Sequence, residues 1–170
     1  MEIRIAPEGI LRWNGRQMRC ALGRGGVRLD KREGDGATPA GTFPLRDVLY
    51  RPDRVARPGS GLPVAAIAPD LGWCDDPADP AYNLPVRLPF AASHERLWRD
   101  DGLYDLLAVI GYNDRPVVAG RGSAIFLHVA RPDFDPTEGC VALPLGDLAE
   151  LLAHCRPGDA LHITAPGASC

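Results

Sequence analysis

Cys140 and His128 are the two residues whose types and spacing could do chemistry. A cysteine thiolate is a strong nucleophile toward a carbonyl carbon, and a nearby imidazole can take the thiol proton. Cys140 directly follows Gly139, which permits a close backbone approach to a substrate carbonyl. Backbone N–H groups around these two residues are natural donors to an oxyanion. The pattern predicts a thiol nucleophile with a histidine base.

A strand and a returning loop must position this pair. The apolar run Ala124–Leu127 leads directly into His128, and a Pro- and Asp-rich loop separates the histidine from Thr137. We expect the histidine at the end of a rigid strand and the cysteine on a loop that doubles back toward it. The remaining chain is interpreted as the scaffold for this site.

The other cysteines have a simpler interpretation. A free cysteine is most often a small buried hydrophobic residue, which we expect for Cys20, Cys74 and Cys155, whereas Cys170 ends the chain. The count of five is odd, with no C-x-x-C pair, so at least one thiol is expected to be free. Neither the cysteines nor the four histidines have clustered ligand spacing, so we expect no metal.

The pattern predicts a mainly β, single-domain, sandwich- or barrel-like fold over residues 1–170, with one or two short helices. Alternating segments joined by Asn14-Gly15 predict an opening meander with a hairpin turn. Apolar spacing from Leu145 predicts a helix to Cys155. The segment near 94–99 is expected to be either a second short helix or a loop. Residues 71–83 are expected to lack regular structure because they are rich in Pro and Asp.

Composition restricts the function classes. The 170 residues are 45% hydrophobic and 24% charged with a net charge of -3, typical of a globular protein and without the basic surplus of a nucleic-acid binder. No apolar run reaches membrane-spanning length, and the N-terminus does not show the pattern of a secretory signal. We therefore expect no nucleic-acid partner and no membrane span.

Two motifs in order resemble a known family. Thr38-Pro39-Ala40-Gly41-Thr42-Phe43 is followed by His128 and then by Thr137-Glu138-Gly139-Cys140. This arrangement resembles the L,D-transpeptidase catalytic domain (the YkuD-like fold), in its short single-domain branch. The resemblance implies catalytic roles for Cys140, His128 and Gly139. Glu138 stands where the best-known branch has a second histidine, and apolar Val141-Ala142-Leu143 replaces a polar segment.

The resemblance implies acyl transfer on peptidoglycan stem peptides without a cofactor. Cys140 would attack the carbonyl of an L-centred residue, normally diaminopimelate, and release D-alanine. An amine of a neighbouring stem would then resolve the acyl-enzyme and form a cross-link. Two alternatives remain open, namely a carboxypeptidase or amidase that uses water as the acceptor, and a non-catalytic peptidoglycan-binding module. A monomer in the periplasm or cell envelope is expected.

Residues around the pair are candidates for substrate contact. Thr137 would hydrogen-bond either the loop or the substrate, and Glu138 is either an orienting or acidic group or a solvated carboxylate. Arg131 could pair with a substrate carboxylate. The remaining candidates for the groove are Trp73, Tyr82 and Asn83. Each of these aromatic-loop residues has plain packing as its alternative.

Overall fold

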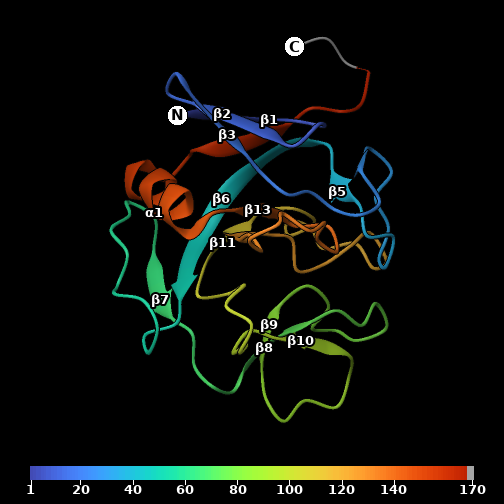
Figure 1. Cartoon of the computed structure of the whole chain (residues 1–170). Coiled ribbons are helices and arrows are strands. Elements are labelled where there is room, and N and C mark those ends of the chain that lie inside the picture. The colour runs from blue at the N-terminus through green and yellow to red at the C-terminus, as the bar shows by residue number, and fades with distance from the viewer. Residues whose placement is uncertain (168–170) are drawn as a thin grey trace.

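In the computed structural model, which describes residues 1–167, a nine-stranded sheet forms the body of the protein. Its strands follow the order β13-β12-β11-β6-β14-β1-β2-β3, and β7 pairs with β6 (Figure 1). The strands of this sheet are β1 (Glu2–Ala6), β2 (Ile10–Trp13), β3 (Arg16–Arg19), β6 (Gly41–Tyr50), β7 (Val64–Ala66), β11 (Leu106–Ile110), β12 (Phe126–Val129), β13 (Val141–Leu143) and β14 (Ala160–Ile163). The sequence thus folds as a mainly β protein, as predicted.

The opening meander forms where the sequence predicted it. Strands β2 and β3 pair antiparallel across Asn14-Gly15, and both turn residues have positive φ, 46° and 72°. Positive φ at both central residues defines a type I′ turn, whose twist matches that of the flanking strands. Parallel pairing of β1 with β14 then brings together the first and last strands of the sequence.

The sheet nearly closes on itself into a barrel. Ala21, just after β3, exchanges two backbone hydrogen bonds of 2.9 Å with Ala142 of β13, at the opposite end of the strand order. These contacts bring the first and last strands together and leave their apolar faces toward a shared core. The barrel-like architecture predicted from the sequence is therefore confirmed.

The predicted C-terminal helix is α1 (Leu145–His154), which packs on β11 and β12. Its Leu148, Leu151 and Leu152 are fully buried in the main core, because the i, i+3, i+4 spacing brings them onto one face. The helix ends before Arg156-Pro157-Gly158, a sequence that cannot continue it. Figure 1 shows α1 beside the sheet, near the connection to β13.

The chain between β7 and β11 forms a second, smaller sheet. It consists of β8 (Leu71–Cys74), β9 (Pro85–Arg87) and β10 (His94–Arg96), in the order β10-β8-β9. A further pair joins β4 (Val27–Arg28) and β5 (Thr38–Pro39). Figure 1 shows the small sheet below the main one. A second core, between the small sheet and β12, buries Ile67, Trp73, Leu97, Tyr104, Leu107, Ala124, Phe126 and Cys140.

Two sequence predictions in this region are wrong. The segment near 94–99 is not a helix: residues 94–96 form β10, which pairs antiparallel with β8. Residues 71–83 are not wholly irregular, because β8 is the central strand of the small sheet. Burial of Leu97 and Trp73 in the second core stabilises this pairing, and tertiary contacts outweigh the local turn signals.

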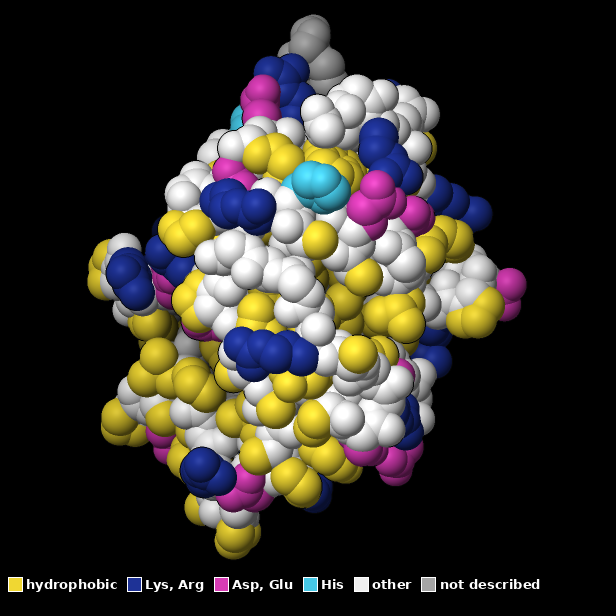
Figure 2. All heavy atoms as spheres, turned by 90° about the vertical axis from the view of Figure 1, so that its left-hand side faces the viewer, with side chains coloured by type: hydrophobic (Ala, Val, Ile, Leu, Met, Phe, Trp, Pro, Cys, Tyr) yellow, Lys and Arg dark blue, Asp and Glu magenta, His cyan; other side chains and the backbone are white. Residues whose placement is uncertain are grey.

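The surface seen from the α1 and β7 side carries mixed charge. Figure 2 shows basic and acidic side chains interspersed among apolar ones, without a large patch of one sign on this face. Within residues 1–167 there is no helix long and apolar enough to cross a membrane, since α1 has ten residues.

Candidate active site

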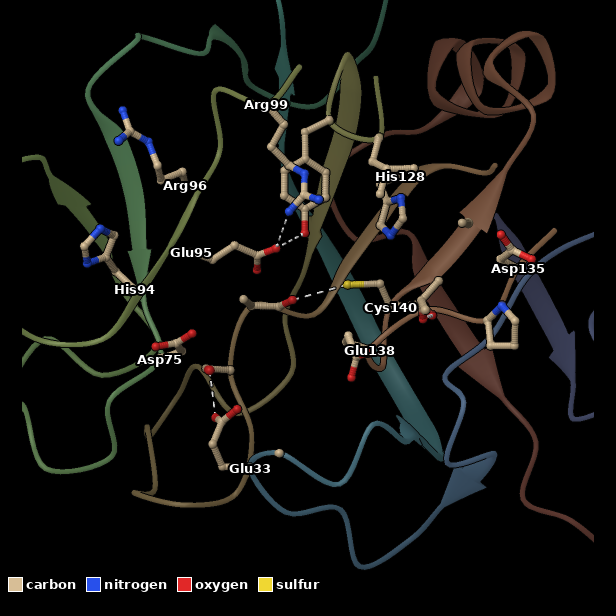
Figure 3. A pocket seen from close by; sticks show the side chains of 18 of the residues that line it. Glu33, Asp75, His94, Glu95, Arg96, Arg99, His128, Asp135, Glu138 and Cys140 are labelled. Carbon is tan, nitrogen blue, oxygen red and sulfur yellow. Dashed lines mark hydrogen bonds and ion pairs between the residues drawn. The ribbon is translucent and has the colours of Figure 1, made fainter. Parts of the chain in front are cut away.

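Adjacent strands bring Cys140 and His128 to one cleft. Strand β12 pairs parallel with β13 in the register Leu127↔Val141 and His128↔Ala142, so Cys140 lies level with Phe126. Side chains two apart on a strand share a face, so Phe126 and His128 project to the same side. Figure 3 shows the imidazole of His128 and the thiol of Cys140 facing a common space. The sequence-predicted pair is therefore brought together.

The Cys140 thiol is held by two backbone groups. Its Sγ accepts a hydrogen bond from Phe126 N and donates one to Ala124 O, both at 3.3 Å. Burial raises the pKa of Cys140 to about 12, and the charge of Glu95 adds to this increase. The thiol of the substrate-free protein is therefore protonated at neutral pH. It is 7% exposed, and the exposed part borders the cleft.

His128 is held as a neutral base. Its Nδ1 lies 2.9 Å from Val129 O, and a carbonyl acceptor assigns the ring proton to Nδ1. The unprotonated Nε2 has no hydrogen-bond partner among the described residues. Burial lowers the pKa of His128 to about 4, so the ring is neutral at pH 7. Tyr104 packs edge-on against the imidazole, with ring centroids 5.3 Å apart, and fixes its orientation.

The loop before Cys140 is tied down by two threonines. Thr137 Oγ1 donates to Cys140 O at 2.7 Å, and Thr38 Oγ1 donates to the same oxygen at 3.3 Å. Gly139 N–H donates to Thr137 Oγ1 at 3.1 Å. Thr137 therefore bonds the loop, and its contact with the substrate stays a prediction. Gly139 N–H is already engaged. Cys140 N–H has no acceptor among residues 1–167, so it is the donor left for an oxyanion.

Gly139 is required for its conformation. Its φ is +133°, and a Cβ at this position would lie 2.8 Å from Ala37 O. A side chain here would both strain the backbone and collide with a carbonyl that cannot move independently. The tight turn into Cys140 therefore requires glycine at position 139.

A cleft of about 610 Å³ opens above the thiol, between the main sheet and the small sheet. This volume suits a small peptide-sized ligand. The residues that line it come from the nucleophile loop, the segment around β10, and the loops that contain Lys31 and Ser123. The cleft gives the buried sulfur an approach from solvent, which a reacting thiol requires.

Acidic and basic side chains that sequence reasoning missed line the cleft opposite the thiol. Figure 3 shows Glu95, Asp75 and Glu33 directed into this space. Glu95 accepts a hydrogen bond of 2.6 Å from Tyr104 and lies 3.5 Å from Arg99. The only sequence signal was the short charged run 94–96, which was interpreted as a helical turn or a loop. Its alternation on a strand directs Glu95 toward the thiol.

Three residues predicted to line the groove lie beneath it. Trp73, Tyr82 and Asn83 are buried and are not among the cleft-lining residues, and their contact with substrate stays a prediction. Asn83 Oδ1 accepts hydrogen bonds from Trp73 Nε1 and from Ala124 N, both at 3.0 Å. Ala124 has a positive φ of 52° and supplies the carbonyl that contacts the thiol. Asn83 therefore supports the nucleophile from below.

The Tyr82 hydroxyl holds a residue that lines the cleft. It donates to Glu33 and accepts from Gly122 N at 2.9 Å, and Glu33 also accepts from Ser123 Oγ at 2.7 Å. Burial raises the pKa of Tyr82, and the Glu33 carboxylate raises it further, so the hydroxyl stays protonated and keeps donating. These two donors satisfy the Oε2 atom of Glu33 within the protein.

Glu138 and Arg131 lie at the rim. The Glu138 side chain is 79% exposed and pairs with Arg24 at 2.8 Å, a contact worth little in solvent. Arg131 lines the cleft and lies 3.7 Å from Asp101. Both residues border the cleft, and their contact with substrate stays a prediction.

Three of the other cysteines are buried and free, namely Cys20, Cys74 and Cys155, as expected from the sequence. None of the three lines the cleft. Burial raises the pKa of each thiol, as expected for inert packing residues. Cys170 lies outside the described residues.

The fold and the site define a barrel-like β domain with a cysteine and a histidine in one cleft. The sequence matches the L,D-transpeptidase catalytic domain (YkuD) over residues 8–163, nearly the whole chain. The chain belongs to this family, which confirms the resemblance found in the sequence motifs.

Comparison with individual proteins adds one structural similarity. The helical cell shape determining protein Pgp2 from Campylobacter jejuni aligns with a TM-score of 0.46 at 14% identity. The alignment covers 95% of this chain and 46% of the Pgp2 chain, so this chain spans less than half the length of that protein. No curated protein matches the sequence. The family membership therefore rests on the sequence match over residues 8–163.

Proposed function

We propose that this chain is a cysteine acyltransferase that forms cross-links between peptidoglycan stem peptides in the cell envelope. The observation that carries the proposal is the placement of a Cys140 thiol and a His128 Nε2 in one cleft. Neither this Nε2 nor Cys140 N–H has a hydrogen-bond partner within the described part of the chain. These groups supply a nucleophile, a base and an oxyanion donor. Membership of the L,D-transpeptidase family supports the choice of substrate.

The reaction takes place in two half-reactions. Cys140 Sγ attacks the carbonyl carbon of an L-centred residue in the donor stem while His128 Nε2 takes the thiol proton. The tetrahedral oxyanion accepts a hydrogen bond from Cys140 N–H, and its collapse breaks the peptide bond as His128 returns the proton to the departing D-alanine amine. An acceptor amine then attacks the thioester, His128 takes a proton from it, and the sulfur leaves and recovers that proton.

The electrostatics determine how the thiol is activated. With a pKa of about 12, only roughly 1 in 10⁵ thiols is ionised at pH 7, and His128, with a pKa of about 4, is neutral. A preformed thiolate–imidazolium pair is therefore disfavoured in the free protein. Proton transfer to His128 accompanies the attack, and the cost of separating charge falls when a substrate covers the cleft and supplies compensating groups.

Product analysis tests the proposal. Purified protein is incubated with disaccharide-tetrapeptides, and the products are separated by mass spectrometry. Cross-linked dimers with released D-alanine are expected. Trimmed monomers would instead indicate a hydrolase with water as acceptor, and binding without turnover would indicate a non-catalytic module.

Matched cysteine variants identify the residue responsible. Cys140→Ala should abolish turnover, whereas Cys20→Ala removes a buried thiol from the main core, away from the cleft, and should retain it. Turnover that persists in folded Cys140→Ala would contradict the thiol mechanism.

A further inference from the structure

Glu95 lies across the cleft from the thiol in a fixed orientation. Its Oε1 accepts the Tyr104 hydroxyl at 2.6 Å, while its Oε2 has no hydrogen-bond partner among the described residues. Figure 3 shows this carboxylate directed into the cleft, whereas His94 and Arg96, its neighbours on β10, lie on the side away from Cys140. One oxygen is thus held by the protein and the other is available to a ligand.

The nearest cation does not neutralise Glu95 fully. Arg99 lies 3.5 Å from Glu95 but makes two shorter contacts with Asp101, at 3.0 and 2.5 Å. Arg131 lies 3.7 Å from Asp101 as well. Because Asp101 is the principal partner of Arg99, a second cation beside Glu95 would be favourable.

Asp75 adds an unsatisfied oxygen to the same wall. Its Oδ1 is inaccessible to solvent and has no hydrogen-bond partner among residues 1–167. Hydrogen bonding of Asp75 N to Ser93 O at 3.1 Å fixes the residue beside β10, and Figure 3 shows its carboxylate facing the cleft. A buried carboxylate oxygen without a donor is costly, and a cation in the cleft beside the Asp75 carboxylate would offset part of that cost.

We propose that Glu95 and Asp75 form a subsite for a primary ammonium group of the substrate, facing the Cys140 thiol. An ammonium group has three donors and one positive charge, which suit Glu95 Oε2 and the Asp75 carboxylate together. This inference rests on the proposed function and specifies it. The ammonium belongs either to the acceptor stem or to the side chain of the donor stem, and the chemistry of recognition is the same in both cases. An acceptor ammonium first gives one proton to Glu95, and the neutral amine then attacks the thioester while His128 takes its second proton.

Occupation of the subsite would also assist the thiol. The Glu95 charge raises the pKa of Cys140, so a cation bound to Glu95 offsets that effect and favours thiolate formation. Ammonium binding and nucleophile activation would thereby be coupled. Water carries no charge and gives no such assistance, so the subsite would favour substrates that carry an amine.

The kinetic test uses Glu95→Gln and Asp75→Asn, which keep size and hydrogen bonding but remove the charge. Glu8→Gln and Asp47→Asn, at exposed positions outside the cleft, are the matched controls. Acylation of Cys140 by a stem tetrapeptide is followed by intact mass, and partition of the acyl-enzyme between amine and water is followed by product ratio. If the ammonium is the acceptor's, each variant lowers the amine-to-water ratio about tenfold without slowing acylation.

If the ammonium is the donor's, acylation falls about tenfold instead, and N-acetylation of the donor side-chain amine causes the same loss in the wild type but none in the variants. Acylation and partition that both stay within about twofold of the controls would overturn the subsite and leave the proposed function intact.

A binding measurement keeps the inference testable if no acylation occurs at all, which would refute the proposed function. Calorimetry measures the affinity of Cys140→Ala protein for the tetrapeptide and for its N-acetylated form. Introducing Glu95→Gln into the Cys140→Ala protein should weaken binding of the amine form about tenfold and leave binding of the acetylated form unaffected. Equal affinity for both forms in Cys140→Ala protein would overturn the subsite independently of any turnover.

Discussion

His128 should make the protein sensitive to mild acid, because its imidazole is buried in the neutral form. Burial lowers its folded-state pKa to about 4 from an ordinary value of 6.5. Between these values the unfolded chain binds a proton that the folded protein does not. The stability from this group is therefore fully present above pH 6.5 and is lost as the pH falls toward 4.

The size of the effect follows from the shift. A difference of about 2.5 pKa units corresponds to roughly 3 kcal/mol when protonation is complete, and to about 2 kcal/mol by pH 5. His128 is only 4% exposed, so solvent screening does not greatly reduce this figure. Glu95 acts in the opposite direction, because burial raises its pKa and the folded protein then gains stability on acidification.

Urea unfolding of the wild type and of His128→Gln from pH 7.5 to pH 5 measures the contribution of His128 to the pH dependence of stability. Glutamine can still donate to Val129 O but does not titrate, and contributions from other groups, Glu95 included, cancel in the difference between the two proteins. The wild type should lose about 2 kcal/mol more than the variant over this range. Parallel curves would show that His128 is not held neutral by burial, and the account of the base would be wrong.

Three further substitutions test the site. Gly139→Ala should lower the free energy of unfolding by at least about 2 kcal/mol. The control is Gly146→Ala, in the first turn of α1 with no atom near a Cβ, which should be neutral or stabilising by up to about 1 kcal/mol. Equal changes in the free energy of unfolding for the two variants would contradict the tight turn at Gly139. Glu95→Gln should speed alkylation of Cys140 by iodoacetamide about three- to tenfold, because it removes a charge that raises the thiol pKa. The rate is measured by peptide mapping at fixed pH, and an unchanged rate would mean that Glu95 and Cys140 are not coupled. Asn83→Ala should lower the free energy of unfolding by about 2–4 kcal/mol, measured by thermal or chemical denaturation. The buried groups that hydrogen-bond the Asn83 amide would lose their partner, and alanine is strained at a φ of 58°. A stability equal to that of the wild type would show that Asn83 does not support the site.

The strongest local signals predicted the main sheet and the pairing of Cys140 with His128 in one site. Asn14-Gly15 encodes its own turn, and the spacing of Leu148, Leu151 and Leu152 encodes the buried face of α1. His128 and Cys140 were identified because their residue types carry chemistry wherever they fold. In each case a few adjacent residues contain the whole signal.

The small sheet and the acidic wall could not be predicted in this way. Strands β8–β10 have three or four residues each, too few to show a period, and their pairing depends on burial of Trp73 and Leu97 against residues distant in sequence. Glu95 belongs to the site only because β10 directs it across the cleft. Asn83 was expected in the groove because a loop residue often carries function, yet its hydrogen bonds lie beneath the surface.

The thioester is the most direct test of the central claim. Wild-type protein is mixed with a donor tetrapeptide in the absence of an acceptor, quenched in acid, and analysed by intact mass and peptide mapping. The account predicts a mass increase equal to the tetrapeptide less D-alanine, located on Cys140 and absent from Cys140→Ala. An adduct on another cysteine, or release of D-alanine by folded Cys140→Ala, would contradict it.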